Sequence, residues 1–299
     1  MFRHLLVPLD GSHLAEATLL PARTLAEKLG ARITLLHVIE KGAPARVHGD
    51  RHLTGVAEAE VYLKGLAERL QLHGLTVDYH VHDTAEGNVT RSINDHAAEM
   101  DADLIVLATH GGGDVRHALF GSIAQQVIGA GEVPVLIIHP EAAPTEFHCR
   151  RLLVPLDGAV GHESSVPVAS NLAAALGASV HLVTAVPRPA HLTGLQGRLS
   201  RMLPSTTAML LDAQERELAS RLDVLAAELR LRGIPASRSI DRGDAIPAIM
   251  KALKATDADL LVLATHSKRG WAAFWSGSVA PRLLAQWRRP TLLVRAQGE

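Results

Sequence analysis

The chain has 299 residues, of which 47% are apolar, 20% charged and 3% aromatic. Its length exceeds one typical domain, and its composition is that of a folded globular protein, which excludes the disordered and collagen-like classes. No apolar run reaches the ~18 residues of a membrane span and the start lacks a secretory signal, so we expect a cytoplasmic protein without a membrane partner. The single cysteine, Cys149, excludes an internal disulfide and a cysteine-based zinc site.

Charge is divided unequally along the chain, although the net charge is only −1. Residues 1–145 hold 11 Lys and Arg against 18 Asp and Glu, whereas residues 146–299 hold 19 against 13. The neutral total argues against nucleic-acid binding by the chain as a whole. The opposite signs favour contact between the halves or between copies of the chain, with two unequal solvated surfaces as the alternative.

Apolar runs alternate with helical patterns through the first 140 residues. The runs predict five strands, at residues 5–9, 32–39, 76–81, 104–108 and 135–138. Helical spacing predicts four helices between them, at residues 12–29, 55–73, 88–100 and 121–130. Start and stop signals flank the helices at Ser12, Ser122, Gly30, Gly74 and Gly131. Pro21 should kink or break the first helix, because proline lacks the backbone N–H.

The second half repeats the first. The sequence RHLLVPLDG at residues 3–11 recurs as RRLLVPLDG at 150–158, and DADLIVLATH at 101–110 recurs as DADLLVLATH at 257–266. The offsets are 147 and 156 residues, so the second copy has gained about nine residues between these anchors. Residues 193–207 are the expected place of this insertion, as a loop.

Several predicted strands are apolar on both faces, which is typical of a parallel sheet covered by helices. The alternation of strands and helices therefore predicts two tandem, doubly wound, five-stranded parallel-sheet domains of the α/β class. We place the first domain at residues 1–142 and the second at 148–299. The last strands, at 133–139 and 290–294, should lie at sheet edges and pair across the two halves.

Two loops of the first copy are candidates for ligand binding, because ligands of open α/β sheets bind beyond the carboxyl ends of the strands. One follows the first strand and carries Pro8, Leu9 and Asp10. The other runs from Ala108 to a Gly-Ser pair at a helix start, where backbone N–H groups suit a polyphosphate. A purely structural role for glycine-rich turns is the alternative, as is a packing role for His110.

The pattern VPLDGS, then ADLIVLATHG, then a Gly-Ser pair resembles the universal stress protein family in its tandem form, over nearly the whole chain. The resemblance implies a Rossmann-like, adenine-nucleotide α-hydrolase-like fold and the ATP-binding branch of the family, whose motif is Gly-x2-Gly-x9-Gly-(Ser/Thr). Only the first glycine is replaced here, by Ala108. Ribose and phosphate contacts are implied for Asp10, Ala108, Gly111, Gly121, Ser122 and Ile123, with adenine beside Pro8 and Val38.

The second copy departs further from that motif. Its matching residues are Pro155, Asp157, Ala264, Ser267, Gly277, Ser278 and Val279. Both leading glycines are lost, and the loop contains Lys268, Arg269 and three large aromatic residues. Either the two cations supply charge to phosphates, or Ser267 and the aromatic residues close the pocket. The second copy thus has two open interpretations, a working site and a structural half.

His80 and His82 would lie on one face of a strand, which suits a divalent ion. No third ligand is in view, so we assign no metal site; an exposed strand face is the alternative. Motifs of P-loop hydrolases, esterases and zincins are missing from the sequence, so we assign no catalytic residues.

We expect an ATP-binding stress-response protein that acts as a nucleotide-dependent regulator of an unidentified protein partner. Mg²⁺ with the nucleotide stays open, as does a homodimer of the internal pseudo-dimer. The alternatives are a nucleotide-free interaction module and a slow ATPase.

Overall fold

The structure is a computed structural model that describes residues 1–42, 46–47, 50–109, 122–140, 146–157, 163–192, 194–265 and 279–295. The chain divides into two compact units by its contacts. The first unit comprises Met1–His148 together with Thr265–Arg295, and the second comprises Cys149–Ala264. Within the described part of the chain, every helix is too short or too polar to span a membrane.

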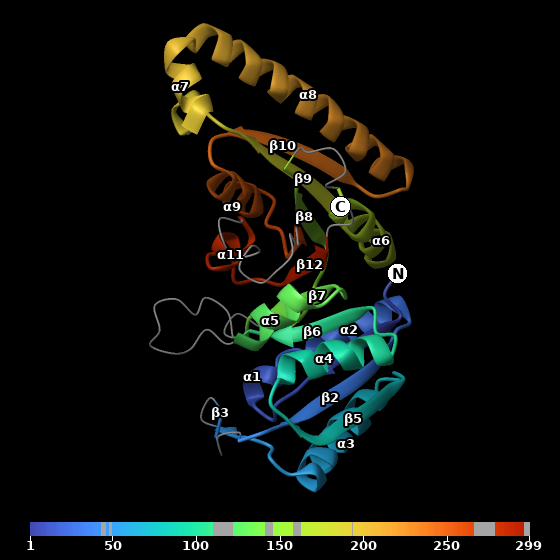
Figure 1. The fold of residues 1–299 in the computed structure, drawn as a ribbon. Coiled ribbons are helices and arrows are strands. Elements are labelled where there is room, and N and C mark those ends of the chain that lie inside the picture. The colour runs from blue at the N-terminus through green and yellow to red at the C-terminus, as the bar shows by residue number, and fades with distance from the viewer. Residues whose placement is uncertain are drawn as a thin grey trace. The chain divides into compact units, whose positions relative to one another are not determined.

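The first unit is built on a parallel sheet that contains the five strands predicted from the first copy (Figure 1). They are β1 (His4–Pro8), β2 (Arg32–Glu40), β5 (Val77–Glu86), β6 (Leu104–Ala108) and β7 (Val135–Ile138). Their order is β7-β6-β1-β2-β5, so the winding reverses between β1 and β6. β5 is five residues longer at its carboxyl end than predicted.

Helices lie on both faces of this sheet. They are α1 (His13–Glu16), α2 (Leu19–Leu29), α3 (Val56–Gln71), α4 (Val89–Glu99) and α5 (Ser122–Ala130). Val81 of β5 packs with the cluster that includes residues of α3, whereas His80 and His82 face α4. Because side chains alternate across a strand, α3 and α4 cover opposite faces.

The first predicted helix is broken into α1 and α2, as Pro21 predicts. Proline cannot donate the bond to the carbonyl of Ala17, and its ring crowds that carbonyl, so the helix restarts after residue 18. Ser12 caps α1, since its Oγ accepts from the N–H of Ala15 at 3.2 Å. Gly30 ends α2 in the left-handed conformation, with φ of 64°.

A short hairpin, β3 (Arg46–Val47) with β4 (Asp50–Arg51), precedes α3 and was not predicted. The N–H of His13 at the start of α1 donates to Asp50 at 3.0 Å. The chain after the hairpin passes over the turn at Gly11. Its residue Leu53 packs against that turn. It therefore covers part of the loop that follows β1.

The second unit has a four-stranded parallel sheet in the order β10-β9-β8-β11. The strands are β8 (Arg151–Pro155), β9 (Ser179–Val186), β10 (Ala236–Arg242) and β11 (Leu260–Thr265). Its helices are α6 (Ser165–Leu176), η2 (Pro189–His191), α7 (Gly194–Met202), α8 (Pro204–Leu231) and α9 (Ala245–Ala255).

The prediction of a loop at residues 193–207 is wrong. Apart from residue 193, which lies outside the described residues, this stretch forms α7 and the start of α8. Pro204 stands at the first position of α8, where its missing N–H has no partner to lose. The same proline therefore begins a helix rather than a loop.

The last strand of the chain, β12 (Thr291–Arg295), belongs to the first unit by its contacts. It pairs antiparallel with β7, with Leu292 opposite Leu136, and the predicted pairing of the two last strands is confirmed. The preceding helix, α11 (Val279–Leu284), also groups with the first unit. Division by contacts thus differs from division by sequence repeat.

The repeated Asp-Ala-Asp sequence fixes the first strand of each repeat. Asp103 accepts from the two backbone N–H groups at the start of β1, at 2.8 to 3.0 Å. Asp259 accepts at 3.0 Å from the two N–H groups at the start of β8. Asp101 and Asp257 turn the chain just before, with left-handed φ of 53° and 46°. The motif is therefore structural at this end of the sheet.

Candidate functional site

The carboxyl ends of β6, β1 and β2 lie side by side at one edge of the first sheet. Pro8 ends β1 in register with Leu36, and Val38 follows on β2. Ala108 ends β6 on the other side of β1. The structure therefore places Pro8, Leu9, Asp10 and Ala108 at the switch point between β1 and β6, with Val38 on β2 at the other side of β1.

The rest of the first predicted site is described only in part. His110, Gly111 and Gly121 lie outside the described residues. α5 begins at Ser122, as predicted, and Ile123 in its first turn is 41% exposed. His266 of the second copy, which matches His110, also lies outside the described residues.

The loop after β1 is tightly organised. The N–H of Leu9 continues the ladder to Leu36 at 2.8 Å. Oδ1 of Asp10 accepts from the N–H of Ser12 at 2.9 Å and from its Oγ at 2.6 Å. Gly11 has a φ of +89°, and a Cβ there would lie 2.6 Å from Cγ of Leu53, so the turn requires glycine. These contacts fix where the Asp10 carboxylate is held.

A side chain of β2 holds the carbonyl of Leu9 in place. His37 is 1% exposed; its Nδ1 lies 2.7 Å from the Leu9 carbonyl oxygen and its Nε2 lies 3.0 Å from that of Leu53. Carbonyl oxygens only accept, so a ring nitrogen that carries hydrogen donates to the carbonyl it faces. We call His37 the loop clamp of the first repeat. It ties the candidate site to the segment that carries Leu53.

The second repeat has its own loop clamp at the matching position. Thr184 of β9 donates from Oγ1 to the carbonyl of Leu156 at 2.7 Å. Leu156 follows β8 as Leu9 follows β1, and its N–H donates to Val183 at 2.8 Å. The two repeats thus hold the same loop with different side chains, and among the described residues the clamp of the first repeat also reaches Leu53.

The second predicted site is brought together in part. Pro155 ends β8, Asp157 follows it, and Ala264 lies near the end of the neighbouring β11. Ser267, Gly277 and Ser278 lie outside the described residues, as do Lys268 and Arg269. Val279 begins α11, which groups with the first unit, and is 38% exposed.

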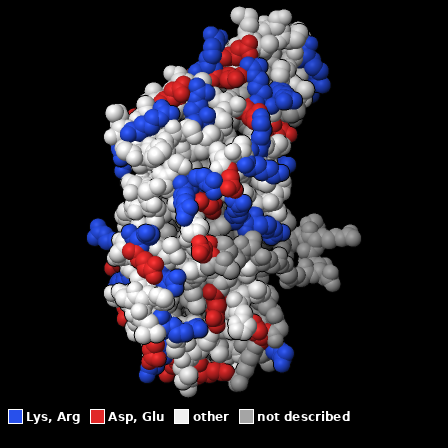
Figure 2. Space-filling view, turned by 180° about the vertical axis from the view of Figure 1, so that it is seen from behind, with Lys and Arg blue, Asp and Glu red and all other residues white. Residues whose placement is uncertain are grey.

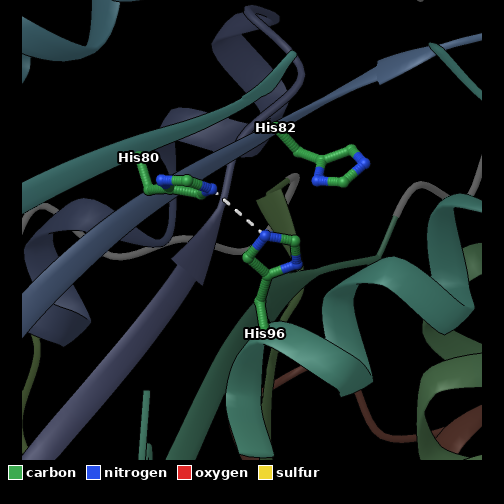
Figure 3. Close-up of side chains that lie close together, drawn as sticks. All are labelled: His80, His82 and His96. Carbon is green, nitrogen blue, oxygen red and sulfur yellow. Dashed lines mark hydrogen bonds between the residues drawn. The ribbon is translucent and has the colours of Figure 1, made fainter. Parts of the chain in front are cut away.

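A cluster of three imidazoles lies on the α4 face of the first unit (Figure 3). His80 and His82 project from β5 on the same face, as predicted, and His96 reaches them from α4. Nε2 of His96 lies 3.1 Å from Nε2 of His80, and the rings of His82 and His96 are 5.0 Å apart. The sequence analysis missed His96, which is 6% exposed. We call these residues the histidine cluster.

Burial lowers the pKa of His80, and the nearby His96 and His82 lower it further. The carboxylates of Asp83 and Glu99 act in the opposite direction. The lowered pKa favours the neutral ring, whose free nitrogen can accept a hydrogen bond or bind a metal.

Cys149 is buried, and burial raises the pKa of its thiol, with a smaller contribution from Asp259. The nucleophilic thiolate is thereby disfavoured, so the structure gives this residue a packing role.

Basic and acidic side chains are intermixed on the face seen in Figure 2. Several arginines of the second unit are paired within it. Arg238 forms a bidentate contact with Asp223, and Arg242 contacts Asp212 and Glu215. Much of the positive charge on β10 is thus partnered by acidic residues of α8.

An open, doubly wound parallel sheet with polar loop residues at its switch point defines a Rossmann-like α/β protein. The family model described as "Universal stress protein family" matches residues 1–139 and 148–295, and the chain belongs to this family, with two such domains in tandem.

Curated relatives agree with that membership. A universal stress protein of Mycolicibacterium smegmatis is 25% identical and covers 97% of this chain and 96% of its own length. The stress response protein NhaX of Bacillus subtilis is 28% identical, over 45% of this chain and 96% of its own length. The first relative matches both repeats, and the second has the length of one.

A solved structure that spans both repeats shows the same fold. The crystal structure of a universal stress protein from Archaeoglobus fulgidus covers 98% of this chain and 96% of its own, with a TM-score of 0.70 and 16% identity. Another protein from that organism was solved in complex with dAMP, at 22% identity, 46% of this chain, 97% of its own and a TM-score of 0.34. At that similarity its ligand is a fact about that protein alone.

Proposed function

We propose that the chain binds ATP at the switch point of its first repeat and acts as a nucleotide-dependent regulatory protein in the stress response. The observation that carries the proposal is the convergence of Pro8, Asp10, Val38 and Ala108 at the ends of three neighbouring strands. This edge is where open α/β sheets bind ligands.

Each residue has a role in this proposal that its chemistry supports. The Asp10 carboxylate, held by Ser12, accepts from ribose hydroxyls. Pro8, which is half-buried, and Val38, which is 7% exposed, are the apolar residues that we place beside adenine. The first turn of α5, from Ser122, offers backbone N–H groups to the phosphates, and Mg²⁺ would neutralise part of their charge.

The second candidate function, a nucleotide-free interaction module, is favoured by a different observation. Large apolar side chains of α7 and α8 are exposed in the second unit. They are Leu199 at 46%, Met202 at 76%, Leu203 at 54%, Met209 at 71% and Leu210 at 66%. Grouped apolar exposure is typical of protein interaction surfaces. The two functions are compatible, since a partner surface on one repeat can serve a protein whose other repeat binds nucleotide.

Nucleotide extraction from the freshly purified full chain tests the proposal. We expect about one or two ATP per chain, and a loss of about one in Asp10→Ala, because the ribose acceptor is removed. Asp157→Ala is the matched control in the second repeat. An unchanged ATP content in this variant would assign all binding to the first repeat.

Circular dichroism checks that each variant is folded. The ATP proposal is contradicted if the folded wild type carries no nucleotide and takes up none on addition of ATP with Mg²⁺. That result would leave the interaction module. ADP released in a single turnover, and lost in Asp10→Ala, would instead support the slow ATPase.

A further inference from the structure

The histidine cluster places three metal-binding side chains around one point of the first unit. One ring nitrogen from each of His80, His82 and His96 lies within 4.8 Å of the others. Two of the residues come from β5, two positions apart, and the third comes from the helix that follows. The alternation of side chains along β5 and the packing of α4 on the sheet thus bring the three rings together at a half-buried place.

Two of the rings are oriented as metal-bound histidines are. Nδ1 of His96 lies 2.7 Å from the carbonyl oxygen of Ser92, so this nitrogen donates and Nε2 keeps its lone pair. Nε2 of His82 lies 3.2 Å from Oε1 of Glu86. Metal-binding histidines commonly donate their second N–H to a carbonyl or carboxylate in this way, which fixes the tautomer.

The free nitrogens point toward one another (Figure 3). Nε2 of His96 faces Nε2 of His80, and the second nitrogen of His82 lies on the side of the ring turned toward His96. Two nitrogens bound to one tetrahedral Zn²⁺ at ~2.0–2.1 Å would be about 3.3 Å apart, close to the 3.1 Å between His80 and His96. The ligand nitrogens of the three residues lie within 4.8 Å of one another, so binding requires the ring of His82 to move toward the other two.

We propose that the histidine cluster binds one divalent transition-metal ion, with Zn²⁺ as the ion that best suits three imidazole ligands. The three histidines supply three positions, and water takes the fourth, since Glu86 is engaged as the partner of His82. This site adjoins the proposed nucleotide site, because the register of β2 with β5 sets His82 opposite Val38, so zinc binding is measured in the absence of ATP.

The second repeat supplies a built-in comparison. The register of β10 with β9 places Ser239 and Asp241 where His80 and His82 stand in the first repeat. The repeat offset places Ala252 where His96 stands. Asp241 instead forms an ion pair with Lys251 at 2.7 Å. We therefore expect one ion per chain, in the first repeat alone.

Zinc binding to the chelator-treated full chain tests the proposal, measured by equilibrium dialysis against ZnCl2. We expect one Zn²⁺ per chain for the wild type and an affinity about 100-fold weaker for His82→Ala. The control is His181→Ala, which removes a histidine of β9 that bonds Ser237 and Ser239, and should bind as the wild type does.

Two further measurements, cobalt absorption and melting temperature, test the same site. Co²⁺ should give the intense visible absorption of a tetrahedral site in the wild type and His181→Ala, but not in His82→Ala. Zn²⁺ should raise the melting temperature of the same two proteins only. If the wild type binds no better than His82→Ala, the proposal is overturned and the short contact is a hydrogen bond between His80 and His96.

Discussion

The two repeats share a frame but differ in the chemistry they attach to it. Asp103 and Asp259 make the same backbone contacts, whereas His37 is matched by Thr184 and His139 by Arg295. The first repeat places buried imidazoles where the second has a hydroxyl or a permanent charge. The comparison teaches that the same strands and loops tolerate either kind of side chain at these positions.

The largest loss in the free energy of unfolding is expected when a loop clamp, His37 or Thr184, is removed. His37→Ala leaves two buried carbonyl oxygens and a cavity, so the free energy of unfolding should fall by about 3–5 kcal/mol. Thr184→Ala removes one hydrogen bond, and its loss should be about 1–2 kcal/mol. Urea unfolding followed by circular dichroism measures both. Equal losses would show that the second contact of His37, to Leu53, contributes nothing.

At acidic pH, His139 should lower the free energy of unfolding by about 3 kcal/mol. Burial, and secondarily the Arg288 guanidinium, lower the pKa of His139 from 6.5 to about 4. Between these values the unfolded chain binds a proton that the native chain does not, so native stability falls as pH drops. The slope is about 1.4 kcal/mol per pH unit.

His139→Leu sharpens this test, because leucine does not titrate. Unfolding should be measured from pH 7 to pH 4.5 in the wild type and the variant, and the variant should lose less stability over this range. Parallel curves for the two proteins would mean that other groups set the acid sensitivity.

The most symmetrical effect on the free energy of unfolding is expected at the strand anchors, Asp103 and Asp259. Asp103→Ala and Asp259→Ala each remove a carboxylate that accepts from two backbone N–H groups. Because both sites are partly exposed, each loss should be about 2 kcal/mol. Thermal unfolding of the two variants side by side measures the difference between them. A loss of stability in only one variant would show that the two carboxylates do not stabilise their repeats equally.

Most of the fold was predictable because the apolar runs are long and the helix signals are strong. β1, β2, β6 and β7 lie where the sequence places them, and Pro21 does break its helix. The hairpin at residues 46–51 was missed because its strands have two residues each. α7 was mistaken for a loop because its glycines and the following proline are also turn signals.

Site residues were predictable from the sequence only where they lie at or just after the end of a strand. Asp10 could be placed from the alternation of strands and helices, whereas Val38 was implied by the family resemblance. His96 could not be joined to His80, because nothing in the sequence states which face of α4 meets the sheet. The role of His37 depends on Leu53, whose segment crosses the loop for reasons of tertiary packing.

The pairing of β12 with β7 has a consequence for synthesis on the ribosome. β7 is complete at residue 138, but β12 begins only at residue 291. At ~5–20 residues per second, the edge of β7 waits about 8–30 s for its neighbour. During that time it presents open backbone groups to any other nascent chain nearby. The half of the molecule that is translated first is the half that is finished last.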